Sequence, residues 1–413
     1  MRGALSVDLR TQTDYGTLRS FMDVGGQWAT ATQGSGGNAA PVDDAVWVDR
    51  SFIQLAGFTV GRIRSYFDIN SLAPYSYANS RISGDSGVLG IYGLAYTAQF
   101  GGGITGTVSL EDNGQAKGGR GHFDANFAVP GVWGLGTISF DNKGQQMPDV
   151  VGDLRVDRTW GYAQVSGALH DASGGYYGGS NLTINGHPPD KRGFAVTGGF
   201  TLNDILGFKG DTFGMQACYS RGAAGYCTRA TGPWQMYGSG NNAGFGWVTD
   251  GVYDSLGSFG SHVELTTVRG INASVQHFWT PRWRTSLYGG YVAVNYNDTA
   301  KAIINSHLPG APGTVVCGVP VSGAATDLGI PAGGSGNSCT PNFSWWQLGT
   351  RTMFNPYPDL DVGIDLMWTH LSTAYKGAGI TLDANGARPG GIYTLADQDV
   401  VTVMFRIQRL FLF

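Results

Sequence analysis

Residues 149–171 read DVVGDLRVDRTWGYAQVSGALHD, and this stretch decides the fold class. Its first half places Val150, Leu154 and Val156 on one face and Asp153, Arg155 and Asp157 on the other. Its second half opposes Ala163, Val165 and Leu169 to Tyr162, Gln164 and Ser166. A period of two is that of a β-strand. The stretch therefore predicts two consecutive strands, each with one apolar face and one polar face.

The same alternation recurs along the chain, most clearly in 360–371 and at the C-terminal end. The expected strands cover 3–11, 16–28, 46–55, 58–64, 89–99, 104–111, 150–158, 160–170, 192–201, 211–221, 263–278, 283–295, 343–354, 360–371 and 398–413. Many of them reach about ten residues, which is enough to cross a bilayer at a tilt, whereas strands of globular sheets usually have about five or six. The pattern favours an all-β protein that crosses a membrane with strands.

The connections alternate between short and long. The short ones lie at 13–16, 56–57, 101–103, 280–282 and 355–358. The long ones lie near 29–45, 65–88, 112–149, 171–191, 222–261, 296–342 and 372–396. Short turns on one rim and long loops on the other are typical of an outer-membrane β-barrel. Aromatic residues at strand ends, Trp345-Trp346, Phe278-Trp279 and Trp283, fit the interfacial girdles of such a barrel.

A soluble β-sandwich is the alternative, with its apolar faces and aromatic residues packed inward. The composition disfavours a soluble β-sandwich, because 14% charged residues and 12% aromatics make a poor water-facing surface for a chain of 413 residues. With 11 Trp, 19 Tyr and 20 Phe, disorder is excluded, and the 67 Gly follow no Gly-x-y period. The net charge of −4 gives no support to a nucleic-acid partner.

Two local patterns could be mistaken for a membrane helix and for a dinucleotide-binding site. Ser86 to Leu110 carries no charge, yet its many Gly and Thr make it two strands joined at Gly101-Gly102-Gly103 and not a membrane helix. The same turn spells GxGxxG at Gly101, Gly103 and Gly106. A dinucleotide site needs a helix after that motif, and here a strand is expected, so no cofactor is predicted.

Catalysis has little support. Seven His are scattered singly, and no HExxH or GxSxG motif occurs. Ser274 and His277 are the nearest Ser-His pair, but three residues apart in a strand they lie on opposite faces. We therefore expect no enzyme activity and no metal site.

The four Cys form two local pairs, Cys218 with Cys227 and Cys317 with Cys339. Neither pair has zinc-ligand spacing. Two short-range disulfides formed in an oxidising compartment are expected, and four buried free thiols are the alternative.

The strand count is about fifteen, whereas bacterial single-chain barrels have even numbers. One explanation is a sixteen-stranded barrel whose first strand lies upstream of this numbering, together with a signal peptide that is not visible here. The other is a strand missed within 112–149, in HFDANFAV or GLGTISF.

The sequence resembles the major outer-membrane porins of Rhizobiales and related alphaproteobacteria. The blocks that carry the resemblance are AGFTVGRIRSYFDIN (56–70), LAYTAQFGGGITGTVSLED (94–112), residues 149–171, HFWTPRWRTSLYGGY (277–291) and the terminal Phe413. With the N-terminal LRTQTDYGTLRSF they span most of the chain. One departure is Arg409, a charge where assembly signals of the family carry an apolar residue.

The resemblance implies one sixteen-stranded transmembrane antiparallel barrel over 1–413, integral to the outer membrane of a Gram-negative bacterium. Residues 65–88 would fold into the lumen as the constriction loop. The function implied is a passive diffusion channel for ions and small hydrophilic solutes. Expected partners are two further copies in a homotrimer, outer-membrane lipid and lipopolysaccharide, and the insertion machinery, with Phe413 as the assembly signal. A secreted soluble β-protein that binds glycans is the alternative function.

The resemblance also implies a constriction where acidic groups on the loop face basic groups on the wall. On the loop these are Asp68 and Asp85, with Arg81 between them. On the wall, inward parity selects Asp8, Arg10, Arg19, Asp23, Arg50 and Arg62 or Arg64, and at other levels Arg155 and Arg351. Each could instead be a rim charge or a salt bridge that braces the loop. A charge on the lipid face is the least expected outcome, since it costs up to about 2–4 kcal/mol at the midplane.

Overall fold

The computed structural model describes residues 2–27, 45–78, 82, 86, 90–112, 124–126, 139–140, 146–177, 183–228, 232–237, 240–254, 261–306, 340–382 and 389–411. Fifteen antiparallel strands form one large sheet in sequence order, and every strand except the two at its edges pairs with a neighbour on either side. They are β1 (Arg2–Thr13), β2 (Gly16–Gln27), β3 (Ala45–Leu55), β4 (Phe58–Ile63), β5 (Ile91–Gly101), β6 (Ile104–Asp112), β9 (Asp149–Arg158), β10 (Gly161–Asp171), β11 (Arg192–Asn203), β12 (Thr212–Arg221), β17 (Thr267–Thr280), β18 (Trp283–Asn295), β19 (Phe343–Tyr357), β20 (Leu360–Ser372) and β23 (Gln398–Arg409). The fifteen strands predicted from the sequence are confirmed, with small shifts at their ends.

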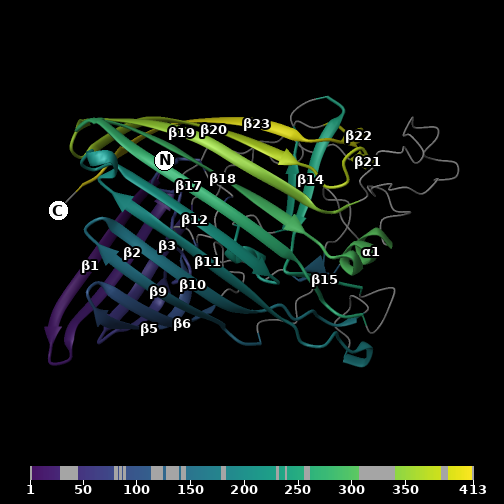
Figure 1. Cartoon of the computed structure of the whole chain (residues 1–413), viewed down its shortest axis with the longest axis horizontal. Helices are drawn as coiled ribbons and strands as arrows, with labels where there is room; N and C mark the ends of the chain where they lie inside the picture. Colours follow the sequence, from purple (N-terminus) through teal and green to yellow (C-terminus); the bar gives the residue numbers. More distant parts are fainter. Residues whose placement is uncertain are drawn as a thin grey trace.

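The sheet curls into a barrel of tilted strands (Figure 1). Its edges are β1 and β23, and no ladder joins them among the described residues. The short strands β7 (Asp124–Asn126) and β8 (Ser139–Phe140) pair in a separate small sheet, so the described part of 112–149 adds no strand to the barrel. The count of sixteen therefore remains a prediction.

Tight turns join the strands at one rim, and the long connections leave from the other (Figure 1). At the tight rim, the turn between β5 and β6 needs glycine, because Gly101, Gly102 and Gly103 have φ of +82°, +56° and +72°. A Cβ on Gly103 would also lie 2.1 Å from the Asp157 carbonyl oxygen. The three glycines are therefore explained by the backbone geometry of this turn and do not indicate a phosphate-binding site.

The two faces of the sheet differ as the alternation predicts. Outward side chains are large, apolar and exposed, as at Leu154 and Val165, which lie opposite each other in the register. Inward side chains are polar and mostly buried, as at Ser109, Gln164 and Asn272. A soluble core would bury the apolar face, so this arrangement requires a lipid surround.

Two four-stranded sheets and one helix fill the long-loop end (Figure 1). The first sheet contains β13 (Gly232–Met236), β14 (Asn242–Val248), β21 (Gly379–Leu382) and β22 (Gly391–Leu395). The second contains β7, β8, β15 (Gly251–Tyr253) and β16 (Glu264–Leu265), and the helix is α1 (Asp298–Ser306). Their side chains pack with the inward ends of the barrel strands in an apolar cluster that includes Val268, Val292 and Trp247. No helix within the described ranges combines the length and apolarity needed to span a membrane.

The aromatic girdle is partly confirmed. Trp279, Trp283 and Tyr357 are exposed at the tight-turn rim, where an interfacial belt is expected. Trp345 is different, because it is fully buried on the inward face and stacks with Phe343 in the apolar cluster. The prediction of a girdle position for Trp345 was wrong, since adjacent residues of a strand point to opposite faces and only Trp346 faces outward.

The lipid face can be tested with a charge at mid-strand. Val165→Arg places a guanidinium on the outer wall and is expected to destabilise the folded barrel by about 2–4 kcal/mol. The measurement is the urea midpoint in detergent or lipid, followed by heat-modifiable migration on gels. Ser6→Arg, on the inward face of β1 beside Asp23, is the matched control and should change the midpoint little. Equal effects of the two variants would contradict the assigned faces.

Candidate functional site in the barrel lumen

The segment 65–78, which follows β4, lies inside the barrel and is fastened first to β6 and β10. Ser65 Oγ and the Tyr66 backbone N–H donate to the Glu111 carboxylate at 2.7 and 3.0 Å. Gln164 Nε2 donates to the Tyr66 carbonyl at 2.9 Å. These groups are mostly buried, so each hydrogen bond satisfies a polar atom that water does not reach.

The middle of the segment is anchored through Asn70 on the opposite wall. Its backbone N–H donates to Gln216 Oε1 on β12 at 2.9 Å. Its side-chain amide donates to Asn272 Oδ1 at 3.0 Å and contacts Ser274 Oγ at 3.4 Å, both on β17. Residues about 200 positions apart in sequence are thus joined by one asparagine.

The far end of the segment docks on β18, β19 and β20. Asp365 Oδ2 accepts from Ser76 Oγ at 2.9 Å and from the backbone N–H groups of Tyr77 and Ala78 at 2.5 and 3.2 Å. Asp365 Oδ1 accepts from the Tyr288 hydroxyl at 2.6 Å. One buried carboxylate therefore ties three consecutive loop residues to the wall.

Arg351, predicted to line the pore, braces the same end of the segment. It is 5% exposed, donates to the Pro74 carbonyl and lies 4.9 Å from the Tyr77 ring centroid. The phenol of Tyr77 has a pKa raised by burial. The structure thus places Arg351 in the bracing role that the sequence left open.

Asp68, expected as a free acid on the loop, is also turned inward. It is 6% exposed and accepts from the Ser86 N–H and hydroxyl at 2.9 and 2.5 Å. Arg64 Nε lies 3.6 Å from the same carboxylate. Asp68 therefore holds the two ends of the loop together. Arg81 and Asp85 lie outside the described residues.

The wall made by β1 and β2 carries exposed charges on its inward face. Asp8 accepts from Arg19 at 2.9 and 3.0 Å and from Arg10 at 3.3 and 3.0 Å. Asp23 accepts from Ser6 Oγ at 2.9 Å. The side chains of Arg10 and Arg19 are 63% and 30% exposed. The structure brings these four predicted residues onto one surface, in two groups.

A third pair on this wall, Arg2 with Asp49, was not predicted as a pair. Arg2 Nη2 lies 2.9 Å from Asp49 Oδ2 and stacks 4.0 Å from the Trp47 ring centroid. Asp49 and Arg50 both face Asp23 across an irregularity in the β2–β3 register. Simple alternation misses such a pair because a β-bulge places two successive side chains on one side.

Arg62 lies on the other face. It shares that face with the exposed Phe58 and Val60, donates to the Val48 carbonyl at 2.9 Å and lies 5.6 Å from the Tyr92 ring centroid. Arg62 therefore does not face the lumen. The sequence offered Arg62 and Arg64 as alternatives, and Arg64 is the one that lies near the loop. A charge at this outward position is tolerated because it sits at the end of the strand.

Arg155 lies on the inward face of β9, as expected. It donates to Asp157 with two bonds of 2.8 Å and to Gln164 Oε1 at 3.2 Å, and its guanidinium is 3.8 Å from the Tyr162 ring centroid. The charge is thus exposed to the lumen but held in place.

The bracing residues were the part that sequence reasoning missed. Glu111, Gln216, Asn272 and Asp365 sit at inward positions of their strands and were not singled out. The signal in the sequence for these residues was that they are polar and occupy inward positions of their strands. That signal is not specific, because polar residues at inward positions are common in any barrel. Their partners in the loop are separated from them by up to 289 residues.

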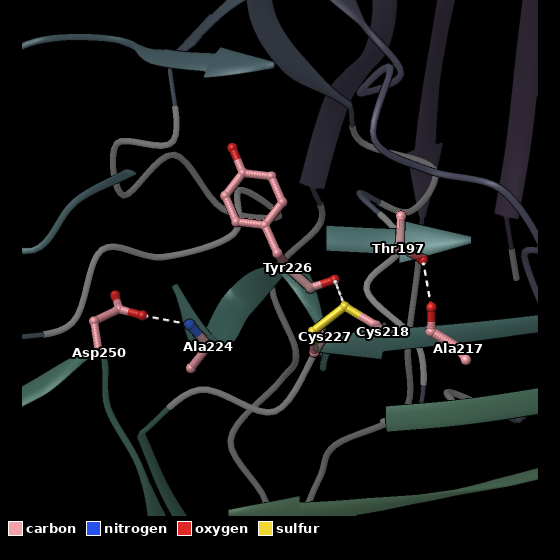
Figure 2. The surroundings of a disulfide bond; sticks show 7 residues. All are labelled: Thr197, Ala217, Cys218, Ala224, Tyr226, Cys227 and Asp250. Carbon is pink, nitrogen blue, oxygen red and sulfur yellow. Dashed lines mark hydrogen bonds between the residues drawn. A yellow bond between two sulfur atoms is a disulfide. The ribbon is translucent and has the colours of Figure 1, made fainter. Parts of the chain in front are cut away.

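The predicted disulfide Cys218–Cys227 joins the end of β12 to the turn that follows it, with Cα atoms 5.4 Å apart. Figure 2 shows the bond against the turn η4 (Ala224–Tyr226), with Asp250 accepting from the Ala224 N–H at 2.5 Å. Ile82 of the loop forms a β-bridge with Thr228, the residue after Cys227. The disulfide thus lies next to the point where Ile82 contacts the wall side of the barrel interior. Cys317 and Cys339 lie outside the described residues.

Arg409 has a partner at the tight-turn rim. Its Nε lies 2.9 Å from Asp359 Oδ2, and this hydrogen bond holds the pKa of the Asp359 carboxyl below its ordinary value. The charge that departs from the usual assembly signal therefore lies at the rim. Phe413 is outside the described residues.

A family model described as the porin subfamily matches residues 1–404. The chain belongs to the porin subfamily. Porins are outer-membrane channel proteins of Gram-negative bacteria and not enzymes, and the resemblance drawn from the sequence blocks is confirmed. The fold class is confirmed as well, whereas the soluble glycan-binding alternative gains no support.

The similar proteins are porins. Porin Omp2b of Brucella canis is 28% identical over 164 residues, which cover 39% of this chain and 40% of that protein. Porin Omp2b of Brucella suis is 28% identical over 167 residues, 39% and 41% of the two chains. The match thus spans about two fifths of these relatives. Among solved structures, the outer membrane channel DcaP of Acinetobacter baumannii has a TM-score of 0.49 at 12% identity, covering 98% of this chain and 95% of that one.

The loop anchor can be tested directly. In Asp365→Ala, residues 76–78 lose their shared acceptor. The backbone amides of Tyr77 and Ala78 are expected to exchange hydrogen at least about tenfold faster, the change expected for loss of a hydrogen bond to a charged group. The measurement is hydrogen exchange by mass spectrometry in detergent. Asp361→Ala is the control, because Asp361, on the same strand, accepts its hydrogen bonds from Arg284 and Asn355 and not from residues 76–78 in the described part of the chain. Unchanged exchange at 76–78 would contradict the anchor.

The disulfide Cys218–Cys227 can be tested by its contribution to stability. Removing it in Cys218→Ala/Cys227→Ala is expected to lower the free energy of unfolding by about 3 kcal/mol on the chain-entropy estimate for a loop of this length. Urea unfolding of the detergent-solubilised protein measures the change. In the double variant Cys317→Ala/Cys339→Ala, which keeps Cys218 and Cys227 as its two cysteines, reductant should lower the free energy of unfolding by a similar amount. No effect of reductant on that variant would contradict the assignment.

Proposed function

We propose that the chain forms a passive, water-filled channel for ions and small hydrophilic solutes in the outer membrane. The proposal rests on the contrast between the two faces of strands β1 and β2. The inward face holds Asp8, Arg10, Arg19 and Asp23 exposed to water, and the outward face holds Leu5 and Leu9, 55% and 63% exposed. Charges on one side and exposed aliphatic groups on the other suit a strand between water and lipid.

The constriction follows from where the loop is fastened. Segment 65–78 hydrogen-bonds to β6, β10, β12, β17, β18, β19 and β20, strands that all follow β5 in the barrel. We infer that the open part of the lumen lies between this segment and the wall of β1 to β3. In this account the charged wall, with Arg155 opposite it, sets selectivity.

The acidic side of the constriction differs from the simple expectation. In the described part of the loop, Asp68 is buried and engaged by Ser86 and Arg64, so it does not present a free carboxylate. We propose that the acidic groups facing solutes are Asp8 and Asp23 of the wall itself. The electric field between acidic and basic side chains would then run along one wall as well as across the lumen.

The proposed partners follow from the class. We propose a homotrimer, contacts with lipid and lipopolysaccharide through the apolar outer wall, and assembly by the outer-membrane insertion machinery through the C-terminal strand that ends at Phe413. Small outward residues, Gly161, Ala163 and Gly167, would permit close packing. No cofactor, metal or nucleic-acid role is proposed.

Conductance in planar bilayers tests the channel. The wild-type chain is expected to give ohmic single-channel steps, and Arg10→Glu/Arg19→Glu is expected to move the reversal potential in a salt gradient toward cations, because two positive charges in the lumen become negative. Arg62→Glu, on the outer wall, is the control and should leave the reversal potential unchanged. A flat trace from folded protein would contradict the channel, and equal shifts in both variants would contradict the assigned lumen wall.

A further inference from the structure

A buried histidine with a carboxylate on each side lies at the long-loop end of the barrel wall. His170 is the penultimate residue of β10, on the inward face that it shares with Gln164. Its Nδ1 lies 2.7 Å from Asp149 Oδ2, at the start of β9. Its Nε2 lies 3.3 Å from Asp250 Oδ2, in the connection between β14 and β15. All three side chains are buried, so they form one cluster shielded from water.

The geometry of the cluster requires a charged ring. An ionised carboxylate accepts hydrogen bonds and cannot donate them, and a neutral imidazole has only one N–H. An aspartate oxygen faces each ring nitrogen of His170. A neutral ring would therefore turn a nitrogen lone pair toward a carboxylate oxygen, which is repulsive. With a proton on both nitrogens, the imidazolium joins the two carboxylates instead.

The other described groups around the cluster supply no second cation. The Tyr226 ring centroid lies 6.2 Å from that of His170, and the Tyr226 hydroxyl donates to Asp149 Oδ2 at 2.6 Å. On β11 the residue opposite His170 is Gly193. On β6 Glu111 lies opposite Asp149 in the register. A phenol, a glycine and a third carboxylate are thus the described neighbours of the cluster.

The two aspartates hold the turn η4. Asp250 Oδ1 accepts from the backbone N–H of Ala224, the first residue of η4, at 2.5 Å (Figure 2). Asp149 accepts from the hydroxyl of Tyr226, the last residue of η4. Both ends of the turn are therefore attached to the carboxylates that His170 joins.

The turn η4 contacts the start of segment 65–78. The Tyr226 ring packs edge-on against the Phe67 ring with centroids 4.7 Å apart, and both side chains are fully buried. Ser65 and Tyr66, directly before Phe67, donate to Glu111. The first three residues of the segment thus rest on Glu111 and on a tyrosine that the histidine cluster holds.

We propose that Asp149, His170 and Asp250 form a proton-dependent latch, closed while both ring nitrogens of His170 carry protons and opened by the loss of one proton. The closed latch fixes η4 and, through Tyr226, the first residues of segment 65–78. The inference rests on the proposed channel and adds a regulation of its constriction by pH.

The distances give the order in which the latch opens. The Nδ1 contact with Asp149 is short, whereas the Nε2 contact with Asp250 is 3.3 Å, so Nε2 is the nitrogen that loses its proton. Its lone pair then faces Asp250, the two groups separate, and Ala224 loses its fixed acceptor. The closed form is therefore present at lower pH, where the ring is charged and the aspartates are ionised, and is lost as pH rises through the titration of His170.

The protonation state is measured by nitrogen NMR of the folded, detergent-solubilised full chain, isotope-labelled at histidine. The wild type should show one ring with two protonated nitrogens at neutral pH, which becomes neutral only in alkaline buffer, and His170→Gln should lack this signal. His277→Gln is the control, because His277 has one carboxylate partner, Asp211, at the tight-turn rim and should leave the signal in place. A neutral His170 ring at neutral pH would overturn the proposal.

Asp250→Asn tests the latch without removing the histidine. Its amide oxygen can still accept from the Ala224 N–H, but the charge that faces Nε2 is gone. His170 should then lose its proton at a pH at least about one unit lower, which corresponds to a tenfold lower proton affinity. Heat-modifiable migration shows that the variant is folded. An unchanged titration of His170 in folded Asp250→Asn would overturn the latch.

Conductance in planar bilayers separates this inference from the proposed function. Single-channel traces of the wild type should become noisier above the pH at which His170 loses its proton, and in Asp250→Asn this onset should move down by the same amount. His277→Gln should behave as the wild type. Traces that do not change while His170 titrates would overturn the regulation and leave the channel standing.

A folded protein that does not conduct would overturn the channel, and hydrogen exchange then decides the latch alone. The amides of Phe67 and Ala224, corrected for the intrinsic pH dependence of exchange, should lose protection at the pH at which His170 titrates. Constant protection across that pH would overturn the latch.

Discussion

The backbone hydrogen bond between neighbouring strands is the interaction on which the rest of the structure depends. In hydrocarbon no water is available to satisfy N–H and C=O groups, so each strand must pair along its length with the next. Fifteen strands in sequence order meet this requirement through short turns on one rim. The strict pairing then forces every side chain to one of two faces, which is why a period of two runs through the sequence.

The lumen obeys a second requirement, that buried polar groups find partners. Segment 65–78 crosses the interior without forming a strand, and its backbone groups are satisfied by the side chains of Glu111, Gln164, Gln216 and Asp365 in turn. The wall residues that accept or donate these hydrogen bonds are polar for this reason. The proposed function rests on the exposed charges of the wall that β1 and β2 form.

Strand positions, faces and rims were predictable because they depend on local alternation and turn residues. Asp8, Arg10, Arg19, Asp23 and Arg155 were placed correctly on the inward face by parity alone. Between Arg62 and Arg64 parity alone did not decide, and the structure places Arg62 on the outward face of β4. For Asp68 and Arg351 the sequence left a pore-lining and a bracing role open, and their contacts in the structure are those of the bracing role.

By itself the sequence predicted an all-β membrane barrel that resembles outer-membrane porins and the position of its tight turns, and it offered Cys218 with Cys227 as one disulfide pair. These depend on residue types and spacings a few positions apart. Only the tertiary structure decided which charges are exposed on the inward face and which ones hold segment 65–78 to the wall. Those roles depend on how segments up to 289 residues apart meet, and local pattern carries no record of such contacts.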